Sequence, residues 1–384
     1  MMRTRNGESR RSGSRQFALT ALLVGGFLSL TAGAIAAPLG EPDIPTMKSA
    51  PEARTVEQEI KLANDYFVGH GVVQDFGQSA YWFERAAGAG DAQAQMQIGY
   101  FYEAGIGVPK DLERAAHWYQ IAASNGSATA KVSLGTLYFW GTGVQEDRQL
   151  AAQLYRQAAA KGSGLAAYYL GDMYYSGAGV AQDEAAGERW YEKGAEMHNA
   201  QAEYDLGLLF FDRVEHAHDV RRAAVLLRES ADADYVPAMY SLGLLLLKNP
   251  NLAKSTDEAT VLLERSAKAG IWKSSLLLGV LARDGRGVPA DASAAYYHFR
   301  VATLQGGDDA KNLLEADIRR LMLSLGPEQT ALLDSEAESW YGQHRNVLEF
   351  VYRGGNDRAK YPNDALAVPE NGTHTVEMLP SLNN

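Results

Sequence analysis

The densest group of residues able to bind a metal ion lies between positions 212 and 219. His216 and His218 stand there beside Asp212, Glu215 and Asp219, and imidazole together with carboxylate oxygen is a ligand set for divalent transition metals. The stretch is expected to form a loop, where residues two positions apart need not converge on one ion. A solvated polar loop is the simpler interpretation, so we predict no metal site.

The rest of the sequence gives little indication of a catalytic site. The 384 residues contain no cysteine and only eight scattered histidines. The lack of cysteine excludes disulfides, thiolate metal sites and a lipid-anchored export signal. No nucleophile can be paired with a base from the spacing of the residues, so we predict no catalytic residue and no cofactor.

Aromatic residues at regular spacing suggest another kind of chemistry, the stacking of sugar rings. Tyr119, Tyr155 and Tyr191 follow one another at intervals of 36 residues, and Trp118 and Trp190 precede two of them. They fall on the side of a helix that is expected to be packed. We therefore assign them to the core.

The 36-residue spacing defines a repeat that is best represented by residues 94–129. Its small residues return without insertion: Ala94 as Ala130, Ala166, Ala202 and Ala238, then Ser274 and Ala310, and Gly99 as Gly135, Gly171, Gly207, Gly243 and Gly279. Residues 66–90 show the same pattern one period earlier, which makes seven units. A fixed period of this length predicts units that bury their apolar faces by stacking on one another.

Each unit is predicted to be a helical hairpin. Its first half, helix A, places Ala94, Ile98 and Tyr102 four residues apart, and its second half, helix B, has the same helical period. Between them lies a Gly-x-Gly-Val loop, whose first glycine, such as Gly105, is expected to end helix A in a left-handed conformation. One position is expected to be the N-cap of helix B in every unit, and it holds Asp75, Asp111, Asp147, Asp183, Asp219, Ser255 and Asp291.

This pattern resembles the Sel-1-like repeats, which are relatives of the tetratricopeptide repeats. The matching residues in the third unit are Ala130, Leu134, Gly135, Tyr138, Gly141, Gly143, Val144, Asp147, Ala151, Tyr155, Ala158, Ala159 and Gly162. The resemblance implies an all-α fold, a right-handed α-solenoid of seven 36-residue helical hairpins plus a C-terminal helical cap. It also implies an adaptor or scaffold for other proteins. Some cysteine-rich relatives are linked to β-lactam binding or hydrolysis, but this chain has no cysteine and the link is not carried over.

The ends of the chain differ from the repeats. Residues 1–36 combine five arginines, an apolar run and the motif Ala34-Ile35-Ala36, which predicts a signal peptide cleaved before Ala37. The alternatives are an uncleaved membrane anchor and twin-arginine export through Arg10 and Arg11. We expect a linker at 37–57, the seven repeats at 58–309, a helical cap at 310–353 and a disordered tail at 354–384.

Charge restricts the class of partner. The chain has 36 basic and 47 acidic residues, and removal of residues 1–36 leaves 31 and 46, a net charge of −15. So acidic a protein is a poor ligand for nucleic acid or anionic membrane surfaces. We expect a periplasmic or secreted protein that binds a protein or peptide of the cell envelope, with polysaccharide as an alternative and no stable membrane insertion after cleavage.

The concave surface of related solenoids is lined by helix A, which indicates where such a partner would bind. We predict ten partner-binding residues: Phe139, Trp140, Tyr168, Asp172, Tyr175, Tyr204, Leu208, Phe211, Tyr240 and Leu244. Tyrosine and tryptophan are common interface anchors because they combine a large apolar area with a polar group. The alternative is that some of these side chains pack between repeats.

Two loops depart from the pattern. The glycines expected in the fifth unit are replaced by Arg213 and Glu215, and those in the sixth by Asn249 and Asn251. Sequence drift in a tolerant surface loop explains this, and contact with a specific partner is the alternative.

The function that fits these features best is a non-enzymatic scaffold of the bacterial envelope, serving signalling or the assembly of a polysaccharide or secretion machine. A carbohydrate-binding solenoid is the first alternative. A hydrolase acting on the cell wall or on β-lactams is the second.

Overall fold

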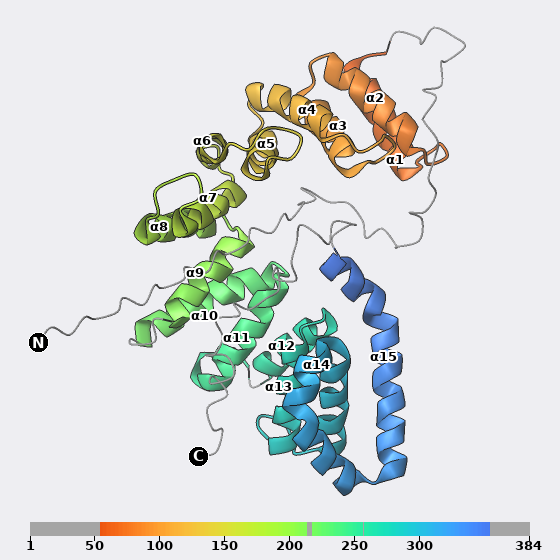
Figure 1. Ribbon diagram of the computed structural model, residues 1–384, viewed down its shortest axis with the longest axis vertical. Helices are drawn as coiled ribbons and strands as arrows, with labels where there is room; N and C mark the ends of the chain where they lie inside the picture. The colour runs from red at the N-terminus through yellow and green to blue at the C-terminus, as the bar shows by residue number, and fades with distance from the viewer. Residues whose placement is uncertain (1–53, 213–216, 256, 354–384) are drawn as a thin grey trace, which may run out of the picture. The chain divides into compact units, whose positions relative to one another are not determined.

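A computed structural model describes residues 54–212, 217–255 and 257–353. Within these ranges the chain forms fifteen α-helices and one 3-10 helix, with no strand (Figure 1). The predicted signal peptide, all but the last four residues of the predicted linker and the predicted tail lie outside the described residues.

The helices alternate between helix A and helix B of successive hairpins. The A helices are α1 (Val56–Val68), α3 (Ala92–Ala104), α5 (Ala128–Trp140), α7 (Gly164–Ser176), α9 (Ala200–Asp212), α11 (Val236–Lys248) and α13 (Trp272–Asp284). The B helices are α2 (Phe76–Gly88), α4 (Leu112–Ser124), α6 (Arg148–Ala159), α8 (Glu184–Glu196), α10 (Ala217–Asp232), α12 (Glu258–Lys268) and the first part of α14 (Ala292–Leu325). The predicted solenoid of seven hairpins is confirmed.

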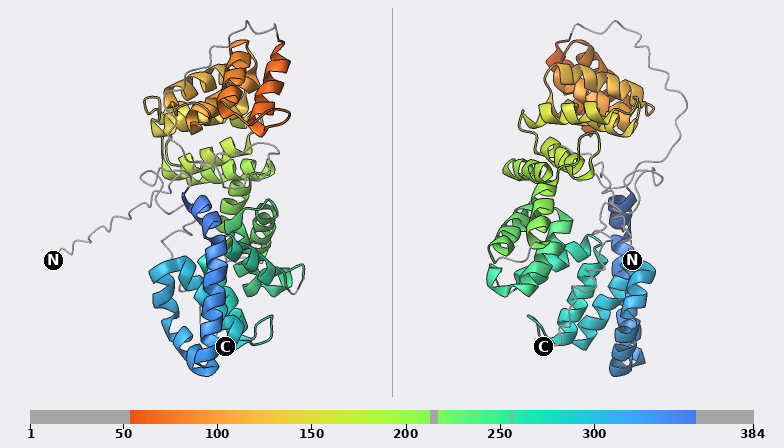
Figure 2. Two further views of the ribbon diagram at one scale, coloured as in Figure 1. Left: turned by 90° about the vertical axis from the view of Figure 1, so that its right-hand side faces the viewer. Right: turned by 60° about the vertical axis from the view of Figure 1, so that its left-hand side comes forward.

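The chain divides into two compact units, one ending at Lys193 and one beginning at Gly194. In the first unit, α2 packs on α3, α4 on α5 and α6 on α7, so the hairpins stack in chain order (Figure 2). In the second unit the same order runs from α9 to α14.

The glycine of helix A lets helix B of the same hairpin approach closely. A Cβ placed on Gly99 would lie 2.7 Å from the Tyr119 ring, and one on Gly171 would lie 2.3 Å from the Tyr191 ring. Real Cβ atoms are essentially never found so close to another atom. The recurring glycine therefore makes room for the large residue of helix B.

The two loop glycines have different tasks. The first one, such as Gly141, ends helix A in the left-handed region with φ of 63°, as predicted. The second one, Gly143, also has a positive φ, and a Cβ there would lie 2.3 Å from the carbonyl oxygen of Leu112 in the preceding hairpin. The second glycine thus allows successive hairpins to touch.

The predicted N-caps of helix B are confirmed in five hairpins. The carboxylates of these residues accept hydrogen bonds from backbone N–H groups of the first turn: Asp75, Asp111, Asp147, Asp183 and Asp291.

The prediction is wrong in the fifth and sixth hairpins. Helix α10 begins at Ala217, so Asp219 lies inside its first turn, and α12 begins only at Glu258, three residues after Ser255. The loop sequences of both hairpins lack the two glycines of the pattern. In the sixth hairpin Asn249 ends α11 with φ of −132°, and Pro250–Leu252 then forms a 3-10 helix (η1).

The C-terminal cap begins inside a kinked helix. Gly307 has a non-helical φ of 60° within α14 and separates helix B of the seventh hairpin from the first cap helix. The second cap helix, α15 (Pro327–Arg353), packs on α14. Four apolar side chains of the cap helices are exposed: Leu313, Met322, Leu323 and Leu332.

Candidate functional site

The regularly spaced tyrosines of helix B belong to the core, as predicted. Tyr119, Tyr155 and Tyr191 are 1%, 2% and 0% exposed. Burial raises the pKa values of the Tyr119 and Tyr155 phenols, because the phenolate loses its hydration. No sugar can stack on rings enclosed in this way.

Each of these hydroxyls reaches a polar group on helix A of its own hairpin. Tyr119 donates to Glu103 at 2.6 Å, and Tyr191 donates to Asp172. The Tyr155 hydroxyl lies 3.0 Å from the Thr136 hydroxyl. A buried hydroxyl without such a partner would cost free energy of folding, so Asp172, a predicted partner-binding residue, has a structural task.

Two predicted anchors stack on Tyr191. The ring centroids of Tyr168 and Tyr175 lie 5.9 Å and 5.3 Å from that of Tyr191, with interplanar angles of 22° and 18°. Both anchors are half-buried. Packing against a fixed ring restricts their rotamers, so a partner that contacts them loses little side-chain entropy on binding.

A second pair of predicted residues lies at the end of α5. Phe139 is buried, and the Arg148 guanidinium carbon lies 5.0 Å above its ring. Trp140 packs its ring at an angle of 78° to that of Phe139 and is half-buried. Of this pair, Trp140 is the residue a partner can reach.

The predicted partner-binding residues of the second unit are mostly buried in its interior. Tyr204, Phe211, Tyr240 and Leu244 are buried, and only Leu208 is half-buried. Tyr240 and Leu244 belong to the hydrophobic core of that unit. The buried residues therefore follow the alternative expectation, in which they pack between repeats. On α11 the reason is a long apolar run that leaves no polar side to face solvent.

The loop that was predicted to hold no metal lies largely outside the described residues. Elsewhere in the described ranges no group of three histidine, aspartate or glutamate residues is arranged to hold an ion. No helix among the described residues is both long and apolar enough to span a bilayer.

The sequence did not reveal a cleft between α14 and α15. It has a volume of about 480 Å³ and is lined by Tyr297, Ser335, Glu336, Ser339, Trp340 and Gln343. Five of these residues recur at intervals of three or four along α15, and that helical spacing was the available signal. Tyr297 comes from α14, more than thirty positions earlier, and only the fold brings it there.

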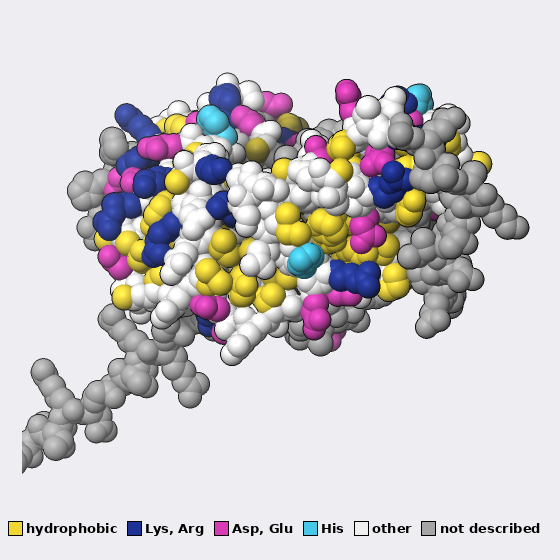
Figure 3. Space-filling model, turned by 90° about the horizontal axis from the view of Figure 1, so that it is seen from above, with side chains coloured by type: hydrophobic (Ala, Val, Ile, Leu, Met, Phe, Trp, Pro, Cys, Tyr) yellow, Lys and Arg dark blue, Asp and Glu magenta, His cyan; other side chains and the backbone are white. Residues whose placement is uncertain are grey.

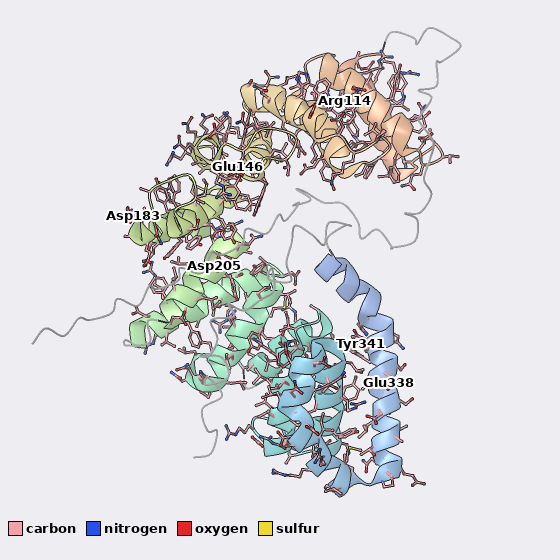
Figure 4. All side chains as sticks on the ribbon, in the orientation of Figure 1. Arg114, Glu146, Asp183, Asp205, Glu338 and Tyr341 are labelled. Carbon is pink, nitrogen blue, oxygen red and sulfur yellow. The ribbon has the colours of Figure 1, made fainter. Side chains whose placement is uncertain are left out.

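The surface carries both signs of charge. On the face drawn in Figure 3, acidic and basic side chains lie among hydrophobic ones. Figure 4 marks charged side chains of both signs, Arg114 on α4 and Asp183 before α8 among them. A surface of mixed charge with scattered exposed apolar side chains is ordinary for a folded protein and does not by itself mark a binding site.

The repeats match one known family. Residues 59–91, 92–127, 128–163, 164–199, 200–235, 236–271 and 273–307 fit the family model described as Sel1 repeat. The chain belongs to the Sel1 repeat family. No curated protein matches it.

Several solved structures are similar to this chain. A Sel1 repeat protein from Oxalobacter formigenes is 27% identical, with a TM-score of 0.56, covering 68% of this chain and 76% of its own. The protective antigen c5321 of uropathogenic Escherichia coli, which displays an SLR fold, is 23% identical, with a TM-score of 0.49 and coverage of 79% and 72%. The immunity protein Pa5087 of Pseudomonas aeruginosa is 21% identical, with a TM-score of 0.38 and coverage of 66% and 81%.

Membership of this family defines a broad class of function. Sel1 repeat proteins are generally scaffolds for protein interaction and are generally not catalytic. A protein partner is therefore the general expectation for this chain.

Proposed function

We propose that this Sel1 repeat protein is a non-enzymatic scaffold of the bacterial cell envelope that binds a protein or peptide on the A helices of its first unit. There it would regulate envelope signalling or help to assemble a polysaccharide or secretion machine. The signal peptide expected at residues 1–36 is the basis for the proposed export to the periplasm or the medium.

The observation that supports this surface is a set of half-buried aromatic side chains on successive A helices. Tyr100 lies on α3, Trp140 on α5, and Tyr168 and Tyr175 on α7. These helices belong to consecutive hairpins that stack in the first unit. Large rings held by packing but still open to solvent are the side chains that dominate protein interfaces.

The test is photo-crosslinking in the source bacterium. A photoreactive amino acid placed at Trp140 or Tyr168 in the full-length chain should capture the same envelope protein, which mass spectrometry would name. Glu184, exposed in the first turn of α8, is the control and should capture nothing in common with them. Phe211 and Tyr240 are unsuitable because they are buried.

Two other outcomes have a clear meaning. Capture of no protein from either position would contradict a protein scaffold on this face. Binding of envelope polysaccharide that is lost in Tyr168→Ala would instead support the carbohydrate-binding alternative. Tyr168 is better suited to this test than Tyr204, since Tyr168 is half-buried whereas Tyr204 is buried.

A further inference from the structure

The cleft between α14 and α15 is preformed by contacts behind it. Asp334 of α15 accepts a hydrogen bond from the Tyr296 hydroxyl at 3.0 Å and another from Arg300 Nε at 2.5 Å. The amide of Gln329 donates to the Ser293 hydroxyl at 2.7 Å. These contacts fix one face of α15 on α14, so the residues that line the cleft need little reordering to bind.

Two aromatic rings form the apolar part of the cleft. Tyr297 comes from α14 and Trp340 from α15. Trp340 is stacked on His344, with 4.3 Å between ring centroids and an interplanar angle of 18°. His344 Nδ1 lies 2.8 Å from the Trp340 carbonyl oxygen, and this arrangement restricts both rings.

A carboxylate provides the charge of the cleft. Glu336 is exposed, and among the described residues it forms no ion pair and no hydrogen bond. Burial and, next, the negative charge of Glu336 raise the pKa of the Tyr297 phenol. Arg300 is the arginine or lysine nearest to Tyr297 in the sequence. Its guanidinium is already paired with Asp334.

This combination fits one kind of side chain. A guanidinium or ammonium group is attracted both to an aromatic face and to a carboxylate. The hydroxyls of Ser335 and Ser339 and the Gln343 amide oxygen can accept its remaining hydrogens. A neutral sugar could also stack on Trp340, but it would gain no attraction from the charge of Glu336.

We propose that the cleft lined by Tyr297, Glu336 and Trp340 binds an arginine or lysine side chain of a protein partner. The proposal shares with the proposed function only the general premise that the chain binds proteins. It uses another unit and other residues, so the two can fail separately.

A row of exposed apolar residues indicates where such a partner would continue. Val225 on α10 and Val261 on α12 stand 72 and 36 residues before Tyr297 and occupy the equivalent position of helix B. They are 52% and 45% exposed. The second, third and fourth hairpins have His117, Gln153 and Arg189 at this position, so an uninterrupted series of apolar or aromatic residues occurs only in the last three hairpins and ends at the cleft.

The proposal is tested on the full chain with small probes, without a partner. Fluorine NMR of protein labelled with fluorotryptophan gives one resonance for each tryptophan, and Trp340→Phe identifies that of Trp340. N-acetyl-arginine amide is the cationic probe, N-acetyl-citrulline amide is its neutral isostere, and methyl glucoside represents a neutral sugar.

We expect the arginine probe to shift the Trp340 resonance, with a response at least several times that of citrulline or the sugar. Glu336→Gln should weaken arginine binding by roughly three- to fivefold. Glu338→Gln is the matched control, because Glu338 is exposed on the same helix and does not line the cleft (Figure 4). It should leave binding unchanged.

Four results would overturn the proposal. Three concern the probes: equal shifts with arginine and citrulline, a stronger response to the sugar, and no shift with any probe. The fourth is equal loss of binding in Glu336→Gln and Glu338→Gln, since the attraction would then be to the general negative charge of α15. Circular dichroism of each variant verifies that the helices are intact.

Discussion

At the scale of single residues, the polar groups of helix A serve the interior of the repeats. Glu103 shows this most clearly. It occupies the same repeat position as Phe139 and Tyr175, two residues predicted to contact a partner, yet its carboxylate accepts a hydrogen bond from the hydroxyl of buried Tyr119. Burial raises the pKa of Glu103, and this effect outweighs the hydrogen bond from Tyr119 and the charge of Lys110, which lower it.

The raised pKa predicts how Glu103→Gln changes stability with pH. A carboxyl whose pKa is higher in the folded than in the unfolded state favours folding when protonated, and this contribution is lost as pH rises through the folded pKa. Glutamine stays neutral and can still accept from Tyr119. Glu103→Gln should therefore raise the free energy of unfolding at pH 7.

The measurement is urea unfolding of both proteins at several pH values. The two stabilities should converge below the ordinary glutamate pKa of 4.5, where both states are protonated. Glu113→Gln, at an exposed position in the first turn of α4, is the control and should not stabilise. A destabilised Glu103→Gln at pH 7 would show that the charged hydrogen bond outweighs the burial of the charge.

At the scale of elements, the loop between helices A and B decides how successive hairpins meet. In the third hairpin Gly143 lies against the backbone of Leu112 at the start of α4. The fifth and sixth hairpins lack this glycine, and their B helices also begin at other positions. In the sixth, Arg228 on α10 holds the new helix start through Glu258 at 2.8 Å and the Leu252 carbonyl oxygen at 3.1 Å.

The contact of Gly143 predicts a large effect of Gly143→Ala. The left-handed conformation alone costs a non-glycine residue roughly 1–2 kcal/mol. Gly162→Ala serves as the control, because Gly162 also has a positive φ but a Cβ there would meet no described atom within 4 Å. Gly143→Ala should cost at least about 1 kcal/mol more than the control, because overpacking adds to the strain.

Thermal unfolding and amide hydrogen exchange would measure this difference. Exchange should increase first at the junction of α4 and α5 in Gly143→Ala and stay unchanged there in Gly162→Ala. Equal effects of the two substitutions would mean that the hairpins can move apart without cost.

At the scale of the whole molecule, the proposed export explains two features of the composition together. The arginine-rich, apolar start contrasts with the acidic remainder, and the chain has no cysteine that an oxidising compartment would pair. Seven stacked hairpins in two compact units provide the buried apolar area instead.

Export predicts a defined mature protein. Protein recovered from the periplasm or the medium should begin at Ala37, as read by mass spectrometry of the intact chain. The double substitution Ala34→Arg and Ala36→Arg should leave the precursor uncut and in the membrane fraction, because the cleavage site requires small residues. A wild-type chain that keeps Met1 in the membrane fraction would support the anchor alternative, and one that keeps it in the cytoplasm would contradict export.

The sequence by itself determined the features that depend on neighbours along the chain. The 36-residue period, the helical spacing and the loop glycines such as Gly141 defined the hairpins, because helix periodicity and left-handed ends are local properties. Five of the seven caps followed in the same way. Asp219 did not, since it lies inside the first turn of α10. Ser255 did not, because the contacts of Arg228 with Glu258 and the Leu252 carbonyl oxygen hold the start of α12 further along the chain.

Only the tertiary structure decided which side chains a partner can reach. Tyr168 and Tyr240 occupy equivalent positions in their repeats, yet the first is half-buried and the second is buried. Exposure depends on what the neighbouring hairpin places beside a residue, and repeat position does not encode that. The cleft at Trp340 exists for the same reason, since α15 folds back on α14 and brings Tyr297 to a tryptophan 43 positions further along the chain.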